Sequence, residues 1–303
     1  MNWTEGIQKA VDYIEEHITE TVNYDTVAAQ SFSSGYHFQR VFSIICGFTV
    51  GEYIRRRRLT LAGEELAAGE AKIIDIALKY GYKNPDSFAK AFRKFHGILP
   101  SEVRLGDSNL NSFSRLVLNF SMKGGEKTNY RIEEKDGMIL TVYGKRFTGA
   151  PYGNEGKAQE GELFTTTRAI QWLLRGASTD PDTYCVISDI DDEGYDFYYC
   201  NHLDGYERNN LYNKNVTGVN FMESLKLKNI IIPRTSYLVF ETENTQNAVD
   251  DYFNLLNLRL QILTEWMPEN GFQLAKAPEL SVYHWTPKNE RNIWIWMPIE
   301  KIR

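Results

Sequence analysis

Apolar residues recur at helical spacing along the first third of the chain, and glycines interrupt them at regular places. One such stretch runs from Ile73 to Tyr80, and Gly81 follows it with the low cost of positive φ that suits a helix end. Asn84 and Pro85 then have the residue types of a helix cap and first turn. The next helix is predicted from Ser87 to Phe95. Its apolar face consists of Phe88, Ala91, Phe92 and Phe95. Helix, glycine turn and helix are typical of a helix-turn-helix unit.

This pattern occurs twice at a fixed distance. Residues 38–52 match residues 88–102 at an offset of 50, and the matched pairs are Phe38 and Phe88, Phe42 and Phe92, Gly47 and Gly97, and Glu52 and Glu102. A single copy is weak evidence, because many ordinary helix pairs look alike, whereas a repeat at constant spacing is much stronger. The sequence therefore predicts two helix-turn-helix units.

Two further helices are predicted around the first copy. Residues 50–67 form a long helix between the copies, which Gly69 ends. Residues 6–17 form an amphipathic helix ahead of the first copy. We therefore expect residues 1–107 to be an all-α domain.

The remainder of the chain changes to short alternating runs that predict strands. A segment rich in Ser, Asn and Gly, residues 108–128, is expected to be a linker to a second domain at 129–303. Strands are predicted at 138–147, 183–189, 195–200, 236–241, 281–285 and 292–298, and helices at 162–174 and 248–266. The order strand, helix, strands occurs twice, which favours a pseudo-two-fold α+β domain with two helices on one curved antiparallel sheet. The expected fold class is thus multidomain, an all-α double helix-turn-helix head plus this α+β domain.

Composition excludes several classes of protein. The 303 residues are 42% hydrophobic and 24% charged, without the run of roughly 18 apolar residues that a membrane helix needs. Residues 1–5 have none of the basic and apolar character of a signal peptide. The three cysteines, Cys46, Cys185 and Cys200, are scattered and form no metal-binding spacing. We expect a cytoplasmic protein with no cofactor, no metal site and no membrane contact.

The net charge of −6 argues mildly against a nucleic-acid partner. Residues 1–107 carry 13 Lys and Arg against 14 Asp and Glu. A positive surface must therefore come from clustering, and residues 55–58, four consecutive arginines, are the obvious cluster. Some of these are expected to pair with acids such as Glu64 or Glu65, and others to face phosphates.

Two stretches of the second unit resemble a known family. Residues 76–82 and 87–101 closely match the second-motif pattern of the AraC/XylS family of transcription activators, and the resemblance covers about residues 5–105. It implies two helix-turn-helix units on a rigid connecting helix, with two recognition helices in successive major grooves of double-stranded DNA. RNA polymerase is then a further expected partner.

The second helix of each unit is expected to contact DNA with the face opposite its Phe pair: Ser34, Tyr36, His37, Gln39 and Arg40 in the first unit, and Asp86, Ser87, Lys90 and Arg93 in the second. The resemblance implies base or phosphate contacts for Tyr36, Gln39 and Arg40. Arginine can pair with guanine and glutamine with adenine, while lysine suits phosphates. The first unit departs from the family pattern because residues 32–33, Phe-Ser, stand where a turn glycine and an apolar residue are usual. We expect Gly35 to supply the flexibility of that turn instead.

The second domain resembles the gyrase-inhibitor-like ligand-binding domain. The resemblance rests on the order and spacing of residues 232–240, 266–272, 278–283 and 295–299. It implies a groove, lined by aromatic residues and an acid, for a small and often cationic aromatic effector.

Seven residues are candidates for that groove: Trp172, Tyr199, Glu241, Glu279, Ser281, Trp294 and Trp296. Ser281 stands where the family commonly has a pocket glutamate, so Glu279, two residues away on the same strand face, or Glu241 takes that role. Without that central acid a strong preference for cations is not implied, and two alternatives stay open: the effector is a neutral molecule, or the domain senses something else. Strand alternation places Trp294 and Trp296 on one face, which is either core or pocket.

The sequence thus predicts a ligand-responsive DNA-binding transcription regulator, an activator by its resemblance. A hydrolase would need a base such as Glu279 or Glu241 beside Tyr199, and no Ser-His-Asp order, GxSxG or HExxH is found. No catalytic residue is therefore assigned. A drug-sequestering binder is the other alternative, against which the DNA-binding head argues.

Overall fold

The computed structural model describes residues 3–31, 34–69, 71–103, 110–117, 130–212, 220–242, 248–285 and 291–302. The chain divides into two compact units. One, the helical unit, consists of Asn2–Gln39 and Thr49–Met122. The other, the sheet unit, consists of Arg40–Phe48 and Lys123–Arg303, so it includes a helical segment from the first third of the chain.

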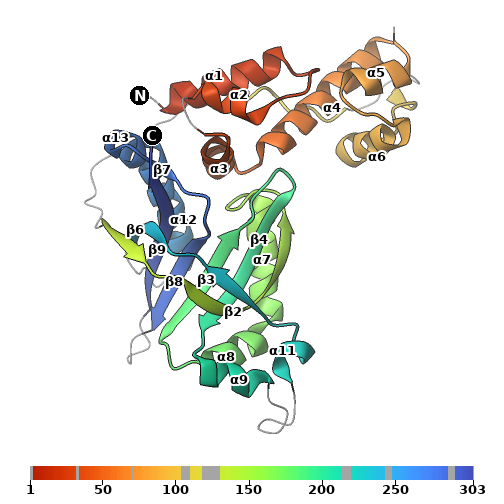
Figure 1. The fold of residues 1–303 in the computed structure, drawn as a ribbon. Coiled ribbons are helices and arrows are strands. Elements are labelled where there is room, and N and C mark those ends of the chain that lie inside the picture. The colour runs from red at the N-terminus through yellow and green to blue at the C-terminus, as the bar shows by residue number, and fades with distance from the viewer. Residues whose placement is uncertain are drawn as a thin grey trace. The chain divides into compact units, whose positions relative to one another are not determined.

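The helices of the first third follow the predicted order (Figure 1). They are α1 (Trp3–Glu16), α2 (Tyr24–Ala29), α3 (Gly35–Cys46), α4 (Val50–Ala68), α5 (Ile73–Lys79) and α6 (Pro85–His96). The pairs α2–α3 and α5–α6 are the two predicted helix-turn-helix units, and α4 is the predicted connecting helix. The prediction of an all-α double helix-turn-helix is confirmed.

The repeated glycines have a common backbone reason. Gly47 and Gly97, at the ends of α3 and α6, have φ of +74° and +83°, a left-handed conformation that a side chain disfavours. Gly69 ends α4 in the same way at +81°, and Gly81 forms the turn after α5 at +85°. The glycine positions therefore mark helix ends, as the sequence predicted.

Gly35 is a different case. It is the first residue of α3 and is not among the glycines with positive φ. A Cβ at this position would lie 2.3 Å from Oδ1 of Asp25. The expectation that Gly35 supplies turn flexibility is wrong, because its φ is not positive; a larger residue here would only require the Asp25 carboxylate to turn away. Phe32 and Ser33 lie outside the described residues.

The sheet unit is built on a single antiparallel sheet. Its strands are β1 (Tyr130–Lys135), β2 (Met138–Thr148), β3 (Asp182–Ser188), β4 (Gly194–His202), β5 (Lys228–Ile232), β6 (Thr235–Thr242), β7 (Phe272–Leu274), β8 (Glu279–Trp285) and β9 (Arg291–Lys301). Among the described residues the strand order is β1-β6-β9-β8-β3-β4-β2-β5, and β7 pairs with the far part of β9. The strand order is symmetric about the middle of the sheet. Each strand has a counterpart at the same distance from the opposite end: β1 corresponds to β5, β6 to β2, β9 to β4 and β8 to β3. This is the predicted pseudo-two-fold arrangement, with its axis between β3 and β8.

In chain order the first half runs from β1 to β4 and the second from β5 to β9, and in each half helices follow the second strand, β2 or β6. The first half has α7 (Asn154–Thr166) and α8 (Arg168–Ala177), with the short α9 (Gly205–Tyr212) and α11 (Phe221–Ser224) after β4. The second half has α12 (Ala248–Gln261), continued by a π-helical turn (Ile262–Trp266) and α13 (Met267–Asn270). The single predicted helix 162–174 is in fact two helices, and it begins earlier. The break falls at Thr167, where consecutive threonine hydroxyls bond back to helix carbonyls.

The two faces of the sheet pack differently. On one face strand residues pack on one another, including Leu280, Val282 and Trp296. The other face packs against helix residues such as Leu163 and Leu174. Alternation along β8 sends Glu279, Ser281 and Tyr283 to this helix-covered face, where the pocket described below lies.

Candidate DNA-binding helices and effector pocket

α6 presents an exposed polar face. The helix begins at Pro85, where Oδ1 of Asn84 accepts a hydrogen bond from the backbone of Asp86 at 2.7 Å. Phe88 and Phe92 are fully buried in the core that α6 shares with α4 and α5. Because those rings fix the rotation of the helix, its other face is exposed. This face carries the predicted DNA contacts Asp86, Ser87, Lys90 and Arg93.

α3 presents a less open face. Ser34 is exposed, and Tyr36 and Gln39 are partly exposed, as a DNA-contacting face requires. His37 and Arg40 are buried, at 2% and 3% exposure. Burial lowers the pKa of His37 to about 4, so its ring is neutral at ordinary pH. As the helix stands, these two predicted DNA contacts are not open to solvent.

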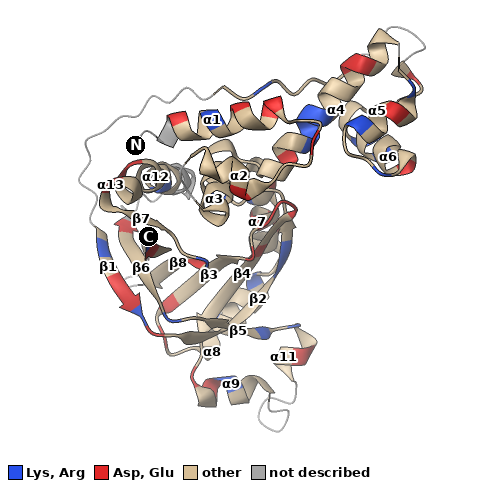
Figure 2. Ribbon diagram, turned by 45° about the horizontal axis from the view of Figure 1, so that its top comes forward, with Lys and Arg blue, Asp and Glu red and all other residues tan. Residues whose placement is uncertain are grey.

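The four arginines of α4 form the clearest basic run on the ribbon (Figure 2). Arg56 pairs with Glu52, Arg57 pairs with Glu15, and Arg58 donates to the carbonyls of Ile18 and Glu20. The acids paired with Arg56 and Arg57 are therefore Glu52 and Glu15 rather than the expected Glu64 or Glu65. Glu65 accepts from Lys79 and Tyr80 instead. The physical reason is that α1 and the turn after it pack against α4, which the local sequence does not reveal.

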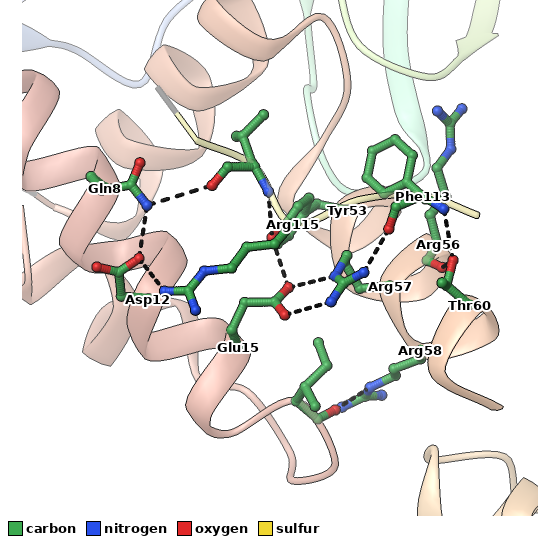
Figure 3. A network of polar contacts seen from close by, with 12 residues as sticks. Gln8, Asp12, Glu15, Tyr53, Arg56, Arg57, Arg58, Thr60, Phe113 and Arg115 are labelled. Atoms are coloured by element: carbon green, nitrogen blue, oxygen red, sulfur yellow. Dashed lines mark hydrogen bonds and ion pairs between the residues drawn. The ribbon is translucent and has the colours of Figure 1, made fainter. Parts of the chain in front are cut away.

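The start of the predicted linker is bound to the helical unit rather than free (Figure 3). Residues 110–117 lie beside α1 and α4. The Phe113 carbonyl accepts a hydrogen bond from Nη1 of Arg57 at 2.6 Å, and the Phe113 N–H donates one to Oγ1 of Thr60 at 2.9 Å. Arg115 pairs with Asp12 of α1 at 2.7 Å. This part of 108–128 therefore belongs to the helical unit.

A cavity of about 70 Å³ lies on the helix-covered face of the sheet, between α7 and α12. We call it the α7–α12 pocket. Its walls are mostly apolar and aromatic, with polar groups from both helices and from β8. The lining residues that matter here are Tyr152, Glu160, Phe164, Phe197, Arg259 and Glu279.

Glu279 is the polar centre of one wall. Its Oε1 accepts from Nε of Arg259 at 2.8 Å and from the hydroxyl of Tyr152, and its Oε2 accepts from Nη2 of Arg40 at 2.7 Å. The carboxylate and both guanidinium groups are 4% exposed or less. Burial alone would raise the pKa of Glu279, but Arg259 and Arg40 outweigh it, so the pKa lies below its usual value and the group stays ionised.

Glu160 of α7 is the second acid of the pocket. It accepts one hydrogen bond, from the hydroxyl of Tyr195 at 2.9 Å, and forms no ion pair among the described residues. Burial raises its pKa to about 7, while the Tyr195 bond and the charge of Arg259 act in the opposite direction. Glu160 is partly exposed, and Arg259 in the same pocket acts on it from beyond ion-pair distance.

The structure brings together only some of the predicted effector residues. Glu279 and Ser281 both line the pocket, as strand alternation predicted, and Ser281 lies 3.4 Å from Nη2 of Arg259. Tyr199 is buried on the same face of the sheet but does not line the pocket.

The other four candidates lie elsewhere. Trp172 is 80% exposed on α8, and Glu241 is exposed on β6. Trp294 and Trp296 belong to the strand-packed face, opposite the pocket, so the open question of core or pocket is answered as core. Glu279, one of the two acids named for a hydrolase with Tyr199, bonds to Arg40, Arg259 and Tyr152.

Known proteins are similar to the first third of the chain. The helix-turn-helix domain family matches residues 27–106. The transcriptional activator AarP of Providencia stuartii is 43% identical over 105 residues, which are 35% of this chain and 78% of AarP. The regulatory protein SoxS of Escherichia coli K12 is 41% identical over 98 residues, which are 32% of this chain and 92% of SoxS.

The chain belongs to the AraC-type family of helix-turn-helix transcription regulators. It is therefore a DNA-binding protein that regulates transcription.

Solved structures are similar to each part of this AraC-type regulator. An AraC-type regulator from Chromobacterium violaceum covers 33% of the chain and 89% of its own, at 26% identity and a TM-score of 0.32. The protein SAV2435, solved with bound tetraphenylphosphonium, covers 57% of the chain and 94% of its own, at 11% identity and a TM-score of 0.41.

The sequence analysis of this AraC-type regulator missed Glu160, Tyr152 and Arg259. Glu160 lies four residues before Phe164, which places both on one side of α7, but a lone glutamate on a helix carries no sign of burial. Within the described ranges no helix is long and apolar enough to cross a membrane, and no group of three or more His, Cys, Asp or Glu is placed to hold a metal.

Proposed function

We propose that this AraC-type regulator controls transcription in response to a small organic cation bound in the α7–α12 pocket. The observation that carries the proposal is Glu160, an acid in an apolar pocket whose hydrogen-bond partner is Tyr195 and whose surroundings supply no paired cation among the described residues. A carboxylate in such a place is stabilised by a ligand that brings a positive charge. Glu279 cannot play this part as it stands, because Arg259 and Arg40 already pair with it.

Aromatic rings around the pocket support the same ligand class. Phe164, Phe197, Tyr152 and Tyr283 line it with Glu160. A ring face attracts an organic cation by about 0.5–2 kcal/mol. Arg259 already uses one such face, with its guanidinium carbon 4.3 Å from the centre of the Tyr152 ring.

The volume of the pocket limits the ligand. Its 70 Å³ is much smaller than the roughly 300–1,000 Å³ of sites that hold drug-sized molecules. The effector is therefore small, or its binding moves side chains that now fill the space between α7 and α12.

We further propose that the exposed faces of α6 and α3 contact successive major grooves of DNA. Asp86, Ser87, Lys90 and Arg93 supply the α6 face, and Ser34, Tyr36 and Gln39 the α3 face. RNA polymerase is the proposed protein partner, by analogy with AarP, whose name describes it as an activator.

Lys90 gives a direct test of the α6 assignment. A duplex selected from a random library serves as the probe, and its affinity is measured by fluorescence anisotropy across a range of salt. Lys90→Ala is expected to weaken binding to all sequences alike and to lower the salt slope by about 1, because a phosphate contact releases about one counterion. Lys276→Ala, at an exposed site in the sheet unit, is the matched control. Equal losses in both variants would show that α6 does not face the DNA.

Glu160 gives the test of the effector proposal. Phenyltrimethylammonium and its neutral isostere tert-butylbenzene are titrated while tryptophan fluorescence or calorimetry reports binding. The cation is expected to bind more tightly than the isostere, and Glu160→Gln should remove that difference. Glu162→Gln, an exposed glutamate on the same helix, controls for loss of charge. Binding that is the same for cation and isostere, or unaffected by Glu160→Gln, would contradict the proposal.

A further inference from the structure

We infer that Arg40 is a built-in cationic partner of the effector pocket, and that an effector cation at Glu160 and Arg40 at Glu279 compete for the negative charge of that pocket. This inference concerns regulation and rests on the proposed function. Arg40 is predicted to contact DNA, yet its guanidinium is bound to Glu279, an acid that lines the α7–α12 pocket. One guanidinium cannot bind Glu279 and a DNA base or phosphate at once.

The ion pair between Arg40 and Glu279 is short and buried. Nη2 of Arg40 lies 2.7 Å from Oε2 of Glu279, and the two side chains are 4% and 1% exposed. Arg40–Phe48 belongs to the same compact unit as the pocket, so this ion pair lies inside the sheet unit. A buried pair of this kind is costly to break by removing one partner, but exchange of one cation for another keeps the carboxylate paired.

A second contact holds the same segment in place. Gly47, at the end of α3, lies against Gly153, which caps the start of α7. A Cβ added to Gly153 would come within 2.2 Å of the Gly47 carbonyl oxygen. The φ of Gly153 is −72°, which an alanine also adopts, so the space and not the backbone requires glycine here.

The charges of the pocket decide which group leaves. Glu160 and Glu279 supply two negative charges when ionised, and Arg259 and Arg40 supply two positive charges. A bound monocation would leave one positive charge in excess in a buried site. Arg259 is fixed by Glu279, Ser281 and the Tyr152 ring, whereas Arg40 has DNA as an alternative partner. Entry of the cation therefore displaces Arg40 and frees it for DNA, and a neutral effector does not.

The coupling must be reciprocal. If the cation strengthens DNA binding, DNA must strengthen cation binding by the same factor, and typical couplings between two sites amount to about five- to 150-fold. Full-length protein, the selected duplex and phenyltrimethylammonium are expected to show a change of this size. Tert-butylbenzene is expected to show none.

Two variants test the Arg40–Glu279 contact itself, independently of which ligand is used. Arg40→Met should tighten phenyltrimethylammonium binding and make it independent of the duplex, because the competitor is gone. Gly153→Ala changes no charge. Because its Cβ pushes Gly47 away, this variant should bind the cation more tightly, and in the absence of effector it should also bind the duplex more tightly. Gly161→Ala, on the same helix with open space around it, should change neither.

The outcomes are distinguishable from failure of the proposed function. If phenyltrimethylammonium does not bind, or binds regardless of Glu160→Gln, the proposed function fails. If cation and duplex both bind but each is indifferent to the other, and Gly153→Ala behaves like Gly161→Ala, this inference alone is overturned. Should Arg40→Met not fold, Gly153→Ala still decides between these results.

Discussion

Replacing Arg57 by leucine is expected to lower the free energy of unfolding of the helical unit by about 1–3 kcal/mol, the cost of leaving a partly buried acceptor without its hydrogen-bond donors. Nε and Nη2 of Arg57 hold the Glu15 carboxylate at 2.8 and 2.9 Å, and Nη1 donates to the Phe113 carbonyl (Figure 3). Both side chains are about 10% exposed. In the variant, the Tyr53 hydroxyl remains as a hydrogen-bond donor to Glu15.

The pH dependence of that loss has a definite sign. Burial pushes the pKa of Glu15 upward, but hydrogen bonds from Arg57 and Tyr53 outweigh it and leave the pKa below the ordinary value of 4.5. An acid whose pKa is lower in the folded chain than in the unfolded chain stabilises the fold at pH values above 4.5. This contribution is lost as the pH falls through the folded-state pKa. Arg57→Leu should therefore destabilise most at neutral pH and least in acid.

Urea unfolding at several pH values measures the effect. Arg115→Leu is the matched control, since Arg115 pairs with Asp12 in the same network but is half exposed. Exposed pairs are worth about 0–1 kcal/mol, so this control should lose little. A similar loss from both variants would mean that the Glu15 pair is not the anchor of the network.

The sequence predicted the helical unit well because its determinants are local. Gly47 and Gly97 end equivalent helices with positive φ, and Phe88 and Phe92 fix the face that α6 buries. The partners of the α4 arginines were beyond prediction. Glu15 is 42 residues from Arg57, and only the packing of α1 on α4 brings them together.

The sheet was predictable where strands are apolar and not where they lie at an edge. β1 and β5 occupy the two ends of the sheet and are largely exposed, so their sequences lack the alternation of the inner strands. The wall formed by Glu279 and Ser281 followed from alternation along β8. The position of Glu160 did not, because whether a helical glutamate is buried depends on what packs over it.

Binding of phenyltrimethylammonium to the α7–α12 pocket is expected to weaken about tenfold for each pH unit below about 7, and to level off above it. The reason is that the cation requires the Glu160 carboxylate, whose pKa burial raises to about 7. The groups around it are Tyr195, Arg259, Glu279 and Cys185, and burial keeps the pKa of the Cys185 thiol well above neutral. Near neutral pH, binding should also release protons, which calorimetry in buffers of different ionisation enthalpy detects. Glu160→Gln should give a flat profile.

The unliganded protein should show the opposite trend, which separates Glu160 from a general effect of pH. Because its folded pKa lies above the ordinary value of 4.5, the unfolded chain ionises first as the pH rises. The contribution of Glu160 to stability is therefore present below 4.5 and is lost between 4.5 and about 7. Affinity for the cation rises across that range while unliganded stability falls, and Glu160→Gln should remove both slopes. Glu162→Gln should keep both. A wild-type protein with flat binding between pH 5 and about 7 would show that the cation does not meet Glu160.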